Sequence, residues 1–247
     1  MKMRSFLALL ILFTGTLTVA GKVKVLILTG ANNHNWQATT PVLVEILESS
    51  GSFKVDVETE PNNQNSKSLA EYDVLLSNWN AFGKTKPAPW RDEFKNAYVD
   101  FIRKGGGHIV VHAGSSSYYD WDDYQEFCIA TWKDGTGHKR PHEFNVRISE
   151  KEHVITHSMR DFRTFDELWY RPFVQPGAKV LAESYSKTTG EWEPTALVAN
   201  FGQGRCFTLL LGHSAETMKN ENFQLILNRG ALWVAGKLHN DSQNIRN

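Results

Sequence analysis

Residues 104–115 read Lys-Gly-Gly-Gly-His-Ile-Val-Val-His-Ala-Gly-Ser. Three glycines end a helical pattern, a short apolar run follows, and the run stops at His112 in a turn of small residues. A nucleophile elbow is built in the same way, from a strand, a tight turn and small neighbours, but it carries Ser or Cys at its tip. The stretch therefore predicts an α/β protein with an imidazole at the carboxyl end of a strand, where ligands bind in open α/β sheets.

Strand and helix patterns alternate on both sides of this stretch in the first half of the chain. The patterns predict strands at residues 22–29, 53–57, 72–77 and 108–111, and helices at 36–49 and 89–103. The first of these strands is almost continuously apolar, which is typical of a strand covered on both faces. This order predicts right-handed β-α-β crossovers and a three-layer α/β fold, in which helices flank a mostly parallel sheet.

The second half of the chain is less regular. The patterns predict a helix at 118–129, strands at 143–148, 179–184, 195–200 and 205–211, and a closing helix at 222–238. No linker or repeat divides the chain, so we expect one domain over residues 21–238 and a polar tail at 239–247. Cys128 and Cys206 are far apart in the sequence, and both a disulfide and two buried thiols remain open for them.

Residues 1–20 have the layout of a secretory signal peptide. Two basic residues precede an apolar run at 6–13, and small residues continue up to Ala20. The run is short for a bilayer span, so we expect cleavage, a periplasmic or secreted protein and no stable membrane insertion; an uncleaved anchor is the alternative. Without Lys2 and Arg4, the 27 Lys and Arg residues fall to 25 against 27 Asp and Glu residues. This balance argues against a nucleic-acid partner.

Several of the nine histidines follow predicted strands. His34, His112 and His213 would meet if the ends of their strands share one edge of the sheet. Imidazole suits both proton transfer and the coordination of a divalent transition metal such as zinc. The loop at 137–143 adds His138 and His142, and we take His142 as the fourth candidate metal ligand. The alternative for each is a surface or hydrogen-bonded histidine, and we expect no nucleotide cofactor.

Two carboxylates, Asp166 and Glu167, stand among aromatic residues. Such surroundings can raise a carboxyl pKa and suit general acid or base catalysis, whereas the alternative is a loop carboxylate that caps backbone amides. The candidate catalytic residues are His112, Asp166, Glu167 and His213. Aromatic side chains near the strand ends could form walls for a sugar ring or could simply pack. The candidate substrate-binding residues are His34, Trp36, Trp79 and Tyr118.

Taken together, these motifs resemble the ThuA family, named for trehalose utilisation, whose fold is similar to that of class I glutamine amidotransferases. The matching pieces, in chain order, are Thr29-Gly30 with His34-Asn35-Trp36, Gly106-Gly107 with His112-Ala113, His153-Val154-Ile155-Thr156, Asp166-Glu167, and Gly202-Gln203-Gly204-Arg205 leading to Gly212-His213. Val154 stands where the family has Pro. The resemblance covers about residues 22–236.

The resemblance implies a role in sugar metabolism, alongside oxidoreductases that make 3-keto sugars. The amidotransferase Cys would fall at His112, so we exclude glutaminase chemistry through a thioester. We expect a small carbohydrate ligand and the cleavage of 3-keto-glycosides such as 3-keto-trehalose, by hydrolysis or elimination, at a His-rich site with or without metal assistance. The alternatives are a non-enzymatic carbohydrate-binding or sensing protein and a metal-dependent hydrolase of a small ester or amide. The sequence leaves the oligomeric state open.

Overall fold

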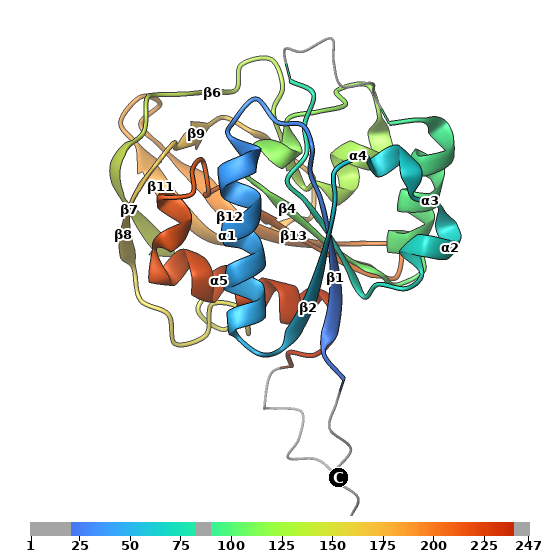
Figure 1. Ribbon diagram of the computed structural model, residues 1–247. Helices are drawn as coiled ribbons and strands as arrows, with labels where there is room; N and C mark the ends of the chain where they lie inside the picture. The colour runs from blue at the N-terminus through green and yellow to red at the C-terminus, as the bar shows by residue number, and fades with distance from the viewer. Residues whose placement is uncertain (1–20, 83–89, 240–247) are drawn as a thin grey trace, which may run out of the picture.

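The computed structural model describes residues 21–82 and 90–239. Figure 1 shows a central sheet with α1 and α5 on one face and α2, α3 and α4 on the other. The predicted α/β fold class, with parallel strands flanked by helices, is confirmed. The predicted signal peptide at 1–20 and residues 240–247 of the predicted tail lie outside the described residues.

The bounds of the elements follow the chain from the first strand to the closing helix. The helices are α1 (Trp36–Ser49), α2 (Ser66–Leu69), α3 (Asp92–Arg103), α4 (Asp122–Phe127) and α5 (Glu221–Val234). The strands of the main sheet are β1 (Val23–Leu28), β2 (Phe53–Glu58), β3 (Val74–Ser77), β4 (Gly107–Val111), β7 (His142–Ile148), β8 (Phe162–Asp166), β11 (Lys179–Ser186), β12 (Glu191–Phe201) and β13 (Gly204–Leu209). Two short antiparallel pairs are β5 (Ala130–Thr131) with β10 (Phe173–Val174), and β6 (Gly137–His138) with β9 (Trp169–Tyr170).

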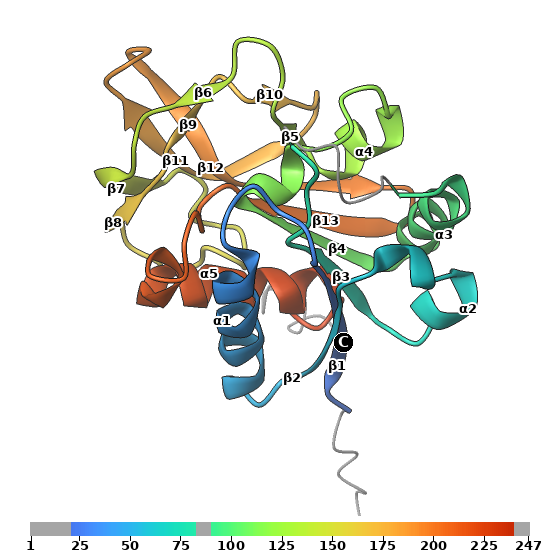
Figure 2. The ribbon, with the colours of Figure 1, turned by 45° about the horizontal axis from the view of Figure 1, so that its top comes forward.

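The main sheet has nine strands in the order β2-β1-β3-β4-β13-β12-β11-β7-β8. The strands from β2 to β13 pair in parallel, as the β-α-β order predicts. From β13 onward the neighbours pair antiparallel and form an extension of the sheet, which Figure 2 shows beyond α5. The strand β8 alternates between buried and exposed residues, whereas β3 and β4 are buried throughout. The extension therefore faces solvent on one side.

Two apolar cores lie on opposite faces of the sheet, because alternate residues of each strand point to opposite sides. In β1, Val25 and Ile27 join the core beneath α1 and α5. Leu26 and Leu28 join the core beneath α3 and α4. The continuous apolar pattern of this strand thus reflects burial on both faces.

Three predicted helices are shorter in the structure, and the one expected at 89–103 begins at Asp92 as α3. The helix expected at 118–129 is reduced to α4, and Ile129 after it adopts a left-handed backbone with φ of 61°. The closing helix stops at Val234, because Gly236 takes a left-handed conformation that ends helices. Cys128 and Cys206 are both buried free thiols. Within the described ranges no helix combines the length and apolarity that a bilayer crossing requires.

Candidate functional site

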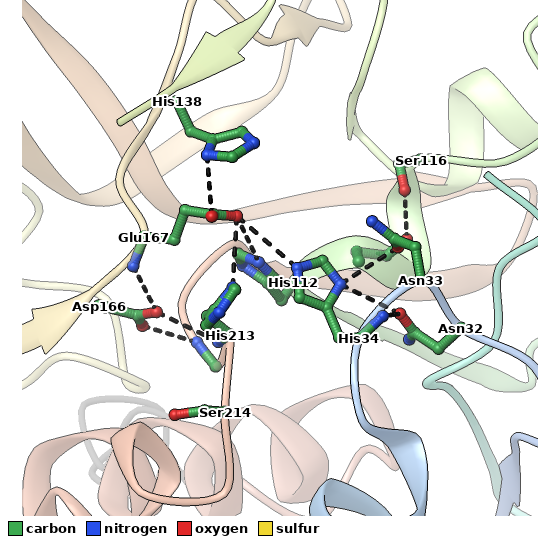
Figure 3. A network of polar contacts seen from close by, with 12 residues as sticks. Asn32, Asn33, His34, His112, Ser116, His138, Asp166, Glu167, His213 and Ser214 are labelled. Atoms are coloured by element: carbon green, nitrogen blue, oxygen red, sulfur yellow. Dashed lines mark hydrogen bonds and ion pairs between the residues drawn. The ribbon is translucent and has the colours of Figure 1, made fainter. Parts of the chain in front are cut away.

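Three imidazoles from distant parts of the chain meet at the carboxyl edge of the parallel strands. His34 follows β1, His112 follows β4 and His213 follows β13. Their ring centroids are 4.5 Å apart for His34 and His213, 5.0 Å for His34 and His112, and 5.5 Å for His112 and His213. Figure 3 shows the carboxylate of Glu167 in the middle of this group. The convergence expected from the strand ends is therefore present in the structure.

The elbow after β4 explains why the sequence places small residues around His112. The backbone of His112 is left-handed, with φ of 44°, and residues His112–Ser115 form a tight 3-10 turn. A side chain on Gly114 would put its Cβ 2.5 Å from the carbonyl oxygen of Ser77, closer than real contacts allow. Only glycine therefore lets the elbow pack against β3.

The backbone of the last parallel strand fixes the tautomer of His112. Its Nδ1 lies 2.7 Å from the carbonyl oxygen of Leu210. A carbonyl oxygen only accepts hydrogen bonds, so Nδ1 donates, and in the neutral imidazole Nε2 carries the lone pair. The ring is buried, and Nε2 lies 3.4 Å from Oε2 of Glu167 with no hydrogen-bond partner among the described residues. Two hydrogen-bond acceptors, Nε2 of His112 and Oε2 of Glu167, thus face each other inside the protein.

His34 is held in the same tautomer by its own loop. Its Nδ1 lies 3.2 Å from Oδ1 of Asn32 and 3.1 Å from Oδ1 of Asn33. The amide of Asn32 is oriented by its other bonds, because its Oδ1 also accepts from the side chain of Asn80 and its Nδ2 donates to the carbonyl of Asn78. The Nδ1 of His34 is therefore a donor, and its Nε2 lone pair lies 3.7 Å from Oε2 of Glu167.

Two further imidazoles contact the same carboxylate. Nδ1 of His213 lies 3.3 Å from Oε2 of Glu167, and Nδ1 of His138 lies 2.8 Å from Oε1. Burial acts to raise the pKa of Glu167, but the surrounding imidazoles of His112, His213 and His34 outweigh it and hold the pKa well below its usual range. The same carboxylate raises the pKa of His213 against the opposing effect of burial. Burial lowers the pKa of His34.

These groups fit a transition-metal site. One ligand atom from each of His34, His112, Glu167 and His213 lies within 4.8 Å of the others. Three imidazole nitrogens and a carboxylate oxygen suit tetrahedral zinc, which holds such ligands at ~2.0–2.2 Å. In metal centres, a hydrogen-bond acceptor typically fixes the ring nitrogen of each histidine that does not bind the metal. The bonds to Leu210 and Asn32 play that part here.

Asp166, which we had expected in the catalytic set, serves the backbone instead. Its Oδ1 accepts from the amides of Glu167 and His213, and its Oδ2 accepts from the amide of Gly212. The side chain is fully buried, and burial raises its pKa against the opposing effects of His112 and these amides. The carboxylate therefore joins the end of β8 to the loop after β13, and it has no access to a ligand.

The predicted ligand His142 and the predicted aromatic walls also need correction. His142 is exposed at the start of β7, where its Nδ1 bonds the carbonyl of Arg140, so Glu167 takes the fourth position of the cluster. Trp79 is 2% exposed and stacks on Tyr118 with ring centroids 5.8 Å apart. These two rings pack in an aromatic core around Trp90, and neither they nor Trp36 line the cavity beside the imidazoles.

That cavity has a volume of about 50 Å³ and is lined by residues from several elements. They are Asn33, His34, Phe82, Ala113, Ser116, Trp132, His138, Glu167 and Trp169. A wider hollow of about 570 Å³ shares Phe82 and Trp132 with it. His138 has no predicted role in the sequence, and neither Trp132 nor Trp169 is among the residues that the sequence predicts for the site. The only local signal for these residues was the aromatic content of the loops.

The comparisons with known proteins agree with this fold. The sequence model of the ThuA family matches residues 24–234. No curated protein sequence matches the chain. The structure is similar to that of a ThuA-like protein from Parabacteroides merdae ATCC 43184, with 27% identity and a TM-score of 0.77 over 88% of this chain and 92% of that one.

Two more distant structures share the fold. A ThuA-like protein from Bacteroides uniformis ATCC 8492 is 18% identical with a TM-score of 0.69, over 90% of this chain and 95% of that one. A glutamine amidotransferase from Thermotoga maritima is 12% identical with a TM-score of 0.50, over 87% and 99%. Since the family match covers most of its length, the chain belongs to the ThuA family, whose description is trehalose utilisation.

Proposed function

We propose that this protein is a metal-dependent enzyme of carbohydrate utilisation that cleaves 3-keto-glycosides such as 3-keto-trehalose. The observation that carries the proposal is the pair of fixed tautomers. Leu210 and Asn32 hold His112 and His34 so that both Nε2 lone pairs face the carboxylate of Glu167. Membership of the ThuA family supports a sugar as the ligand.

A divalent cation between these acceptor atoms would remove the repulsion among them. Lone pairs that face a carboxylate inside a protein repel each other unless a positive charge lies between them. A single proton satisfies only one such contact, whereas His112, His34 and His213 all face the same Oε2. The donor set is that of zinc and its neighbours among the transition metals. A metal bound here would polarise a ketone oxygen as a Lewis acid.

The residues around the cluster suit a sugar ring. Trp132 and Trp169 pack edge to face with centroids 5.1 Å apart and line the cavity beside Glu167. Aromatic faces of this kind contact the C–H faces of a sugar. The adjoining hollow of about 570 Å³ lies in the range of small-molecule sites, so there is room for a second sugar ring.

His138 is placed to move the proton. Its side chain is 40% exposed at the mouth of the cavity, and its Nδ1 donates to Oε1 of Glu167. That bond leaves Nε2 as a base and stabilises the imidazolium that forms when Nε2 takes a proton. In a 3-keto-glycoside the acidic C2–H bond breaks and its proton goes to His138. The electron pair forms the C1=C2 bond, the C1–O bond breaks, and the proton is returned to the leaving oxygen. Addition of water to the double bond would complete hydrolysis.

The test is incubation of the purified protein with 3-keto-trehalose, and with trehalose as the control. We expect cleavage of the keto sugar in the presence of zinc, manganese, cobalt or nickel, and loss of that activity with a chelator. His138→Asn should lower kcat by about 10²–10⁴-fold, the usual contribution of an acid–base group. His157→Asn, which changes an exposed imidazole outside the cluster, should have no effect.

Two results would contradict the proposal. One is the absence of product with every metal. The other is tight binding of unoxidised trehalose without turnover, which would favour a carbohydrate-binding or sensing protein. Export remains a prediction that rests on the sequence of residues 1–20 alone.

A further inference from the structure

A second cavity lies on the antiparallel extension and has no part in the chemistry above. We infer that it is a binding groove for an acidic carbohydrate chain, one whose sugar rings carry carboxylate or sulfate groups. The groove has a volume of about 840 Å³ and lies between the segment 139–145, Arg163 in β8, Tyr170 in β9 and the hairpin that joins β11 to β12. The inference goes beyond the proposed function and does not depend on it, because the groove shares no lining residue with the imidazole cavity.

One segment of chain separates the groove from the imidazole cavity. Glu167 and Trp169 line the cavity, whereas Leu168 and Tyr170 line the groove. The pairing of β9 with β6 continues this wall, and Figure 2 shows β6, β7, β9 and β11 together at this end of the molecule. A chain bound in the groove would therefore lie one strand away from Glu167.

The groove is rich in unpaired positive charge. Lys139, Arg140 and Lys187 are exposed along it and have no ion-pair partner in the described part of the chain. The carboxylate of Glu143 is paired with Arg163. Cations on a groove that lack local counterions favour an anionic ligand, and hydrogen bonds between charged groups are among the stronger ones.

Exposed aromatic rings line the same groove. Tyr185 and Trp192 are 49% and 44% exposed, with ring centroids 5.6 Å apart. The guanidinium of Arg147 lies 3.5 Å from the centroid of the Trp192 ring and is ion-paired with Glu183, which restrains that ring. Large exposed aromatics held in place are suited to stack against sugar rings. Rings and cations together indicate a sugar with negative substituents.

The charge of the whole chain argues against a nucleic acid as the occupant. Lys and Arg number 27 and Asp and Glu number 27, so the chain as a whole carries no excess of positive charge. Duplex binding requires the neutralisation of many phosphates over an extended surface. A short acidic oligosaccharide needs only a few cations beside a stacking ring.

Calorimetry with a tetramer of galacturonic acid tests the inference, with maltotetraose as the neutral control and inorganic polyphosphate as the polyanion control. We expect binding of the tetragalacturonate that weakens with added salt, and no comparable binding of the two controls. The triple variant Lys139→Glu, Arg140→Glu, Lys187→Glu should raise Kd at least about tenfold, since a single bond to a charged group is worth that factor. Trp192→Ala should also weaken binding, whereas Lys54→Glu on the distant strand β2 should not.

The remaining outcomes separate this inference from the proposed function. His112→Ala should leave tetragalacturonate binding unchanged, since its ring lies in the other cavity. Three results would each overturn the inference. Tetragalacturonate binding could persist in the triple variant, or maltotetraose could bind equally well. Polyphosphate could also bind equally well, with an affinity that Trp192→Ala does not change. Absence of keto-glycoside cleavage in a protein that still binds tetragalacturonate would overturn only the proposed function.

Discussion

Asp166 and Glu167 are neighbours in the sequence with opposite tasks. Asp166 gives both oxygens to backbone amides and ties the end of β8 to the loop that carries His213. The carboxylate of Glu167 instead contacts the imidazoles of His34, His112, His138 and His213. Of the two interpretations weighed from the sequence, the amide cap is confirmed for Asp166, whereas a catalytic role for Glu167 stays a prediction.

Asp166→Asn tests the structural role of this carboxylate. The amide NH₂ would face a backbone N–H that Asp166 now satisfies, so we expect the free energy of unfolding to fall by about 1–3 kcal/mol, the cost of an unsatisfied buried group. Urea denaturation measures the change. Asp161→Asn is the matched control, because Asp161 accepts one amide hydrogen bond, from Ile148, on an exposed side chain. Equal losses in the two variants would contradict a special role for Asp166.

At the scale of elements, β4 shows how one strand serves two purposes. Ile109 and Val111 enter the core beneath α5, Val110 enters the opposite core, and the strand ends at the His112 elbow. His108 lies on the same strand, fully buried, and its Nδ1 lies 3.1 Å from the carbonyl oxygen of Phe127. The strand therefore carries one histidine for packing and one for the site.

His108 makes the fold sensitive to acid. Burial, partly offset by the bond to Phe127, lowers its pKa from 6.5 to about 3. Below pH 6.5, His108 binds a proton in the unfolded chain but not in the folded chain. The free energy of unfolding therefore falls as the pH falls towards 3. The contribution of His108 to this decrease in unfolding free energy approaches about 1.4 kcal/mol per pH unit. Unfolding free energies between pH 7 and pH 4 should decline less steeply in His108→Gln than in the unaltered protein. Parallel declines would show that His108 does not contribute.

At the scale of the whole molecule, the site lies where the two halves of the sheet meet. The parallel half supplies His34, His112 and His213 at its strand ends. The antiparallel extension supplies Glu167 after β8, and the separate β6–β9 pair supplies His138. A ligand at the imidazoles thus contacts both halves, and the groove continues over the extension.

This division of the sheet explains which parts of the site could be predicted from the sequence. Strand ends of a parallel sheet share an edge, so the meeting of His34, His112 and His213 follows from local patterns. The position of Glu167 depends on long-range pairing of β7 with β8 in the extension and of β6 with β9 beside it, whose register local patterns do not fix. For that reason local patterns pointed to His142, whereas the structure brings Glu167 and not His142 to the imidazole cluster. The burial of Trp79 likewise depends on packing against Trp90, which belongs to no strand-end pattern in the sequence.

We propose that the fixed tautomers of His34 and His112 prepare the imidazole cluster for a metal ion. The most direct test is metal analysis and zinc titration of protein purified without a histidine tag. We predict one equivalent of a divalent transition metal per chain, lost in His112→Ala and retained in His157→Ala, because His157 lies outside the cluster. Protein that binds no zinc, or a His112→Ala variant that binds it as tightly as the unaltered chain, would contradict the account.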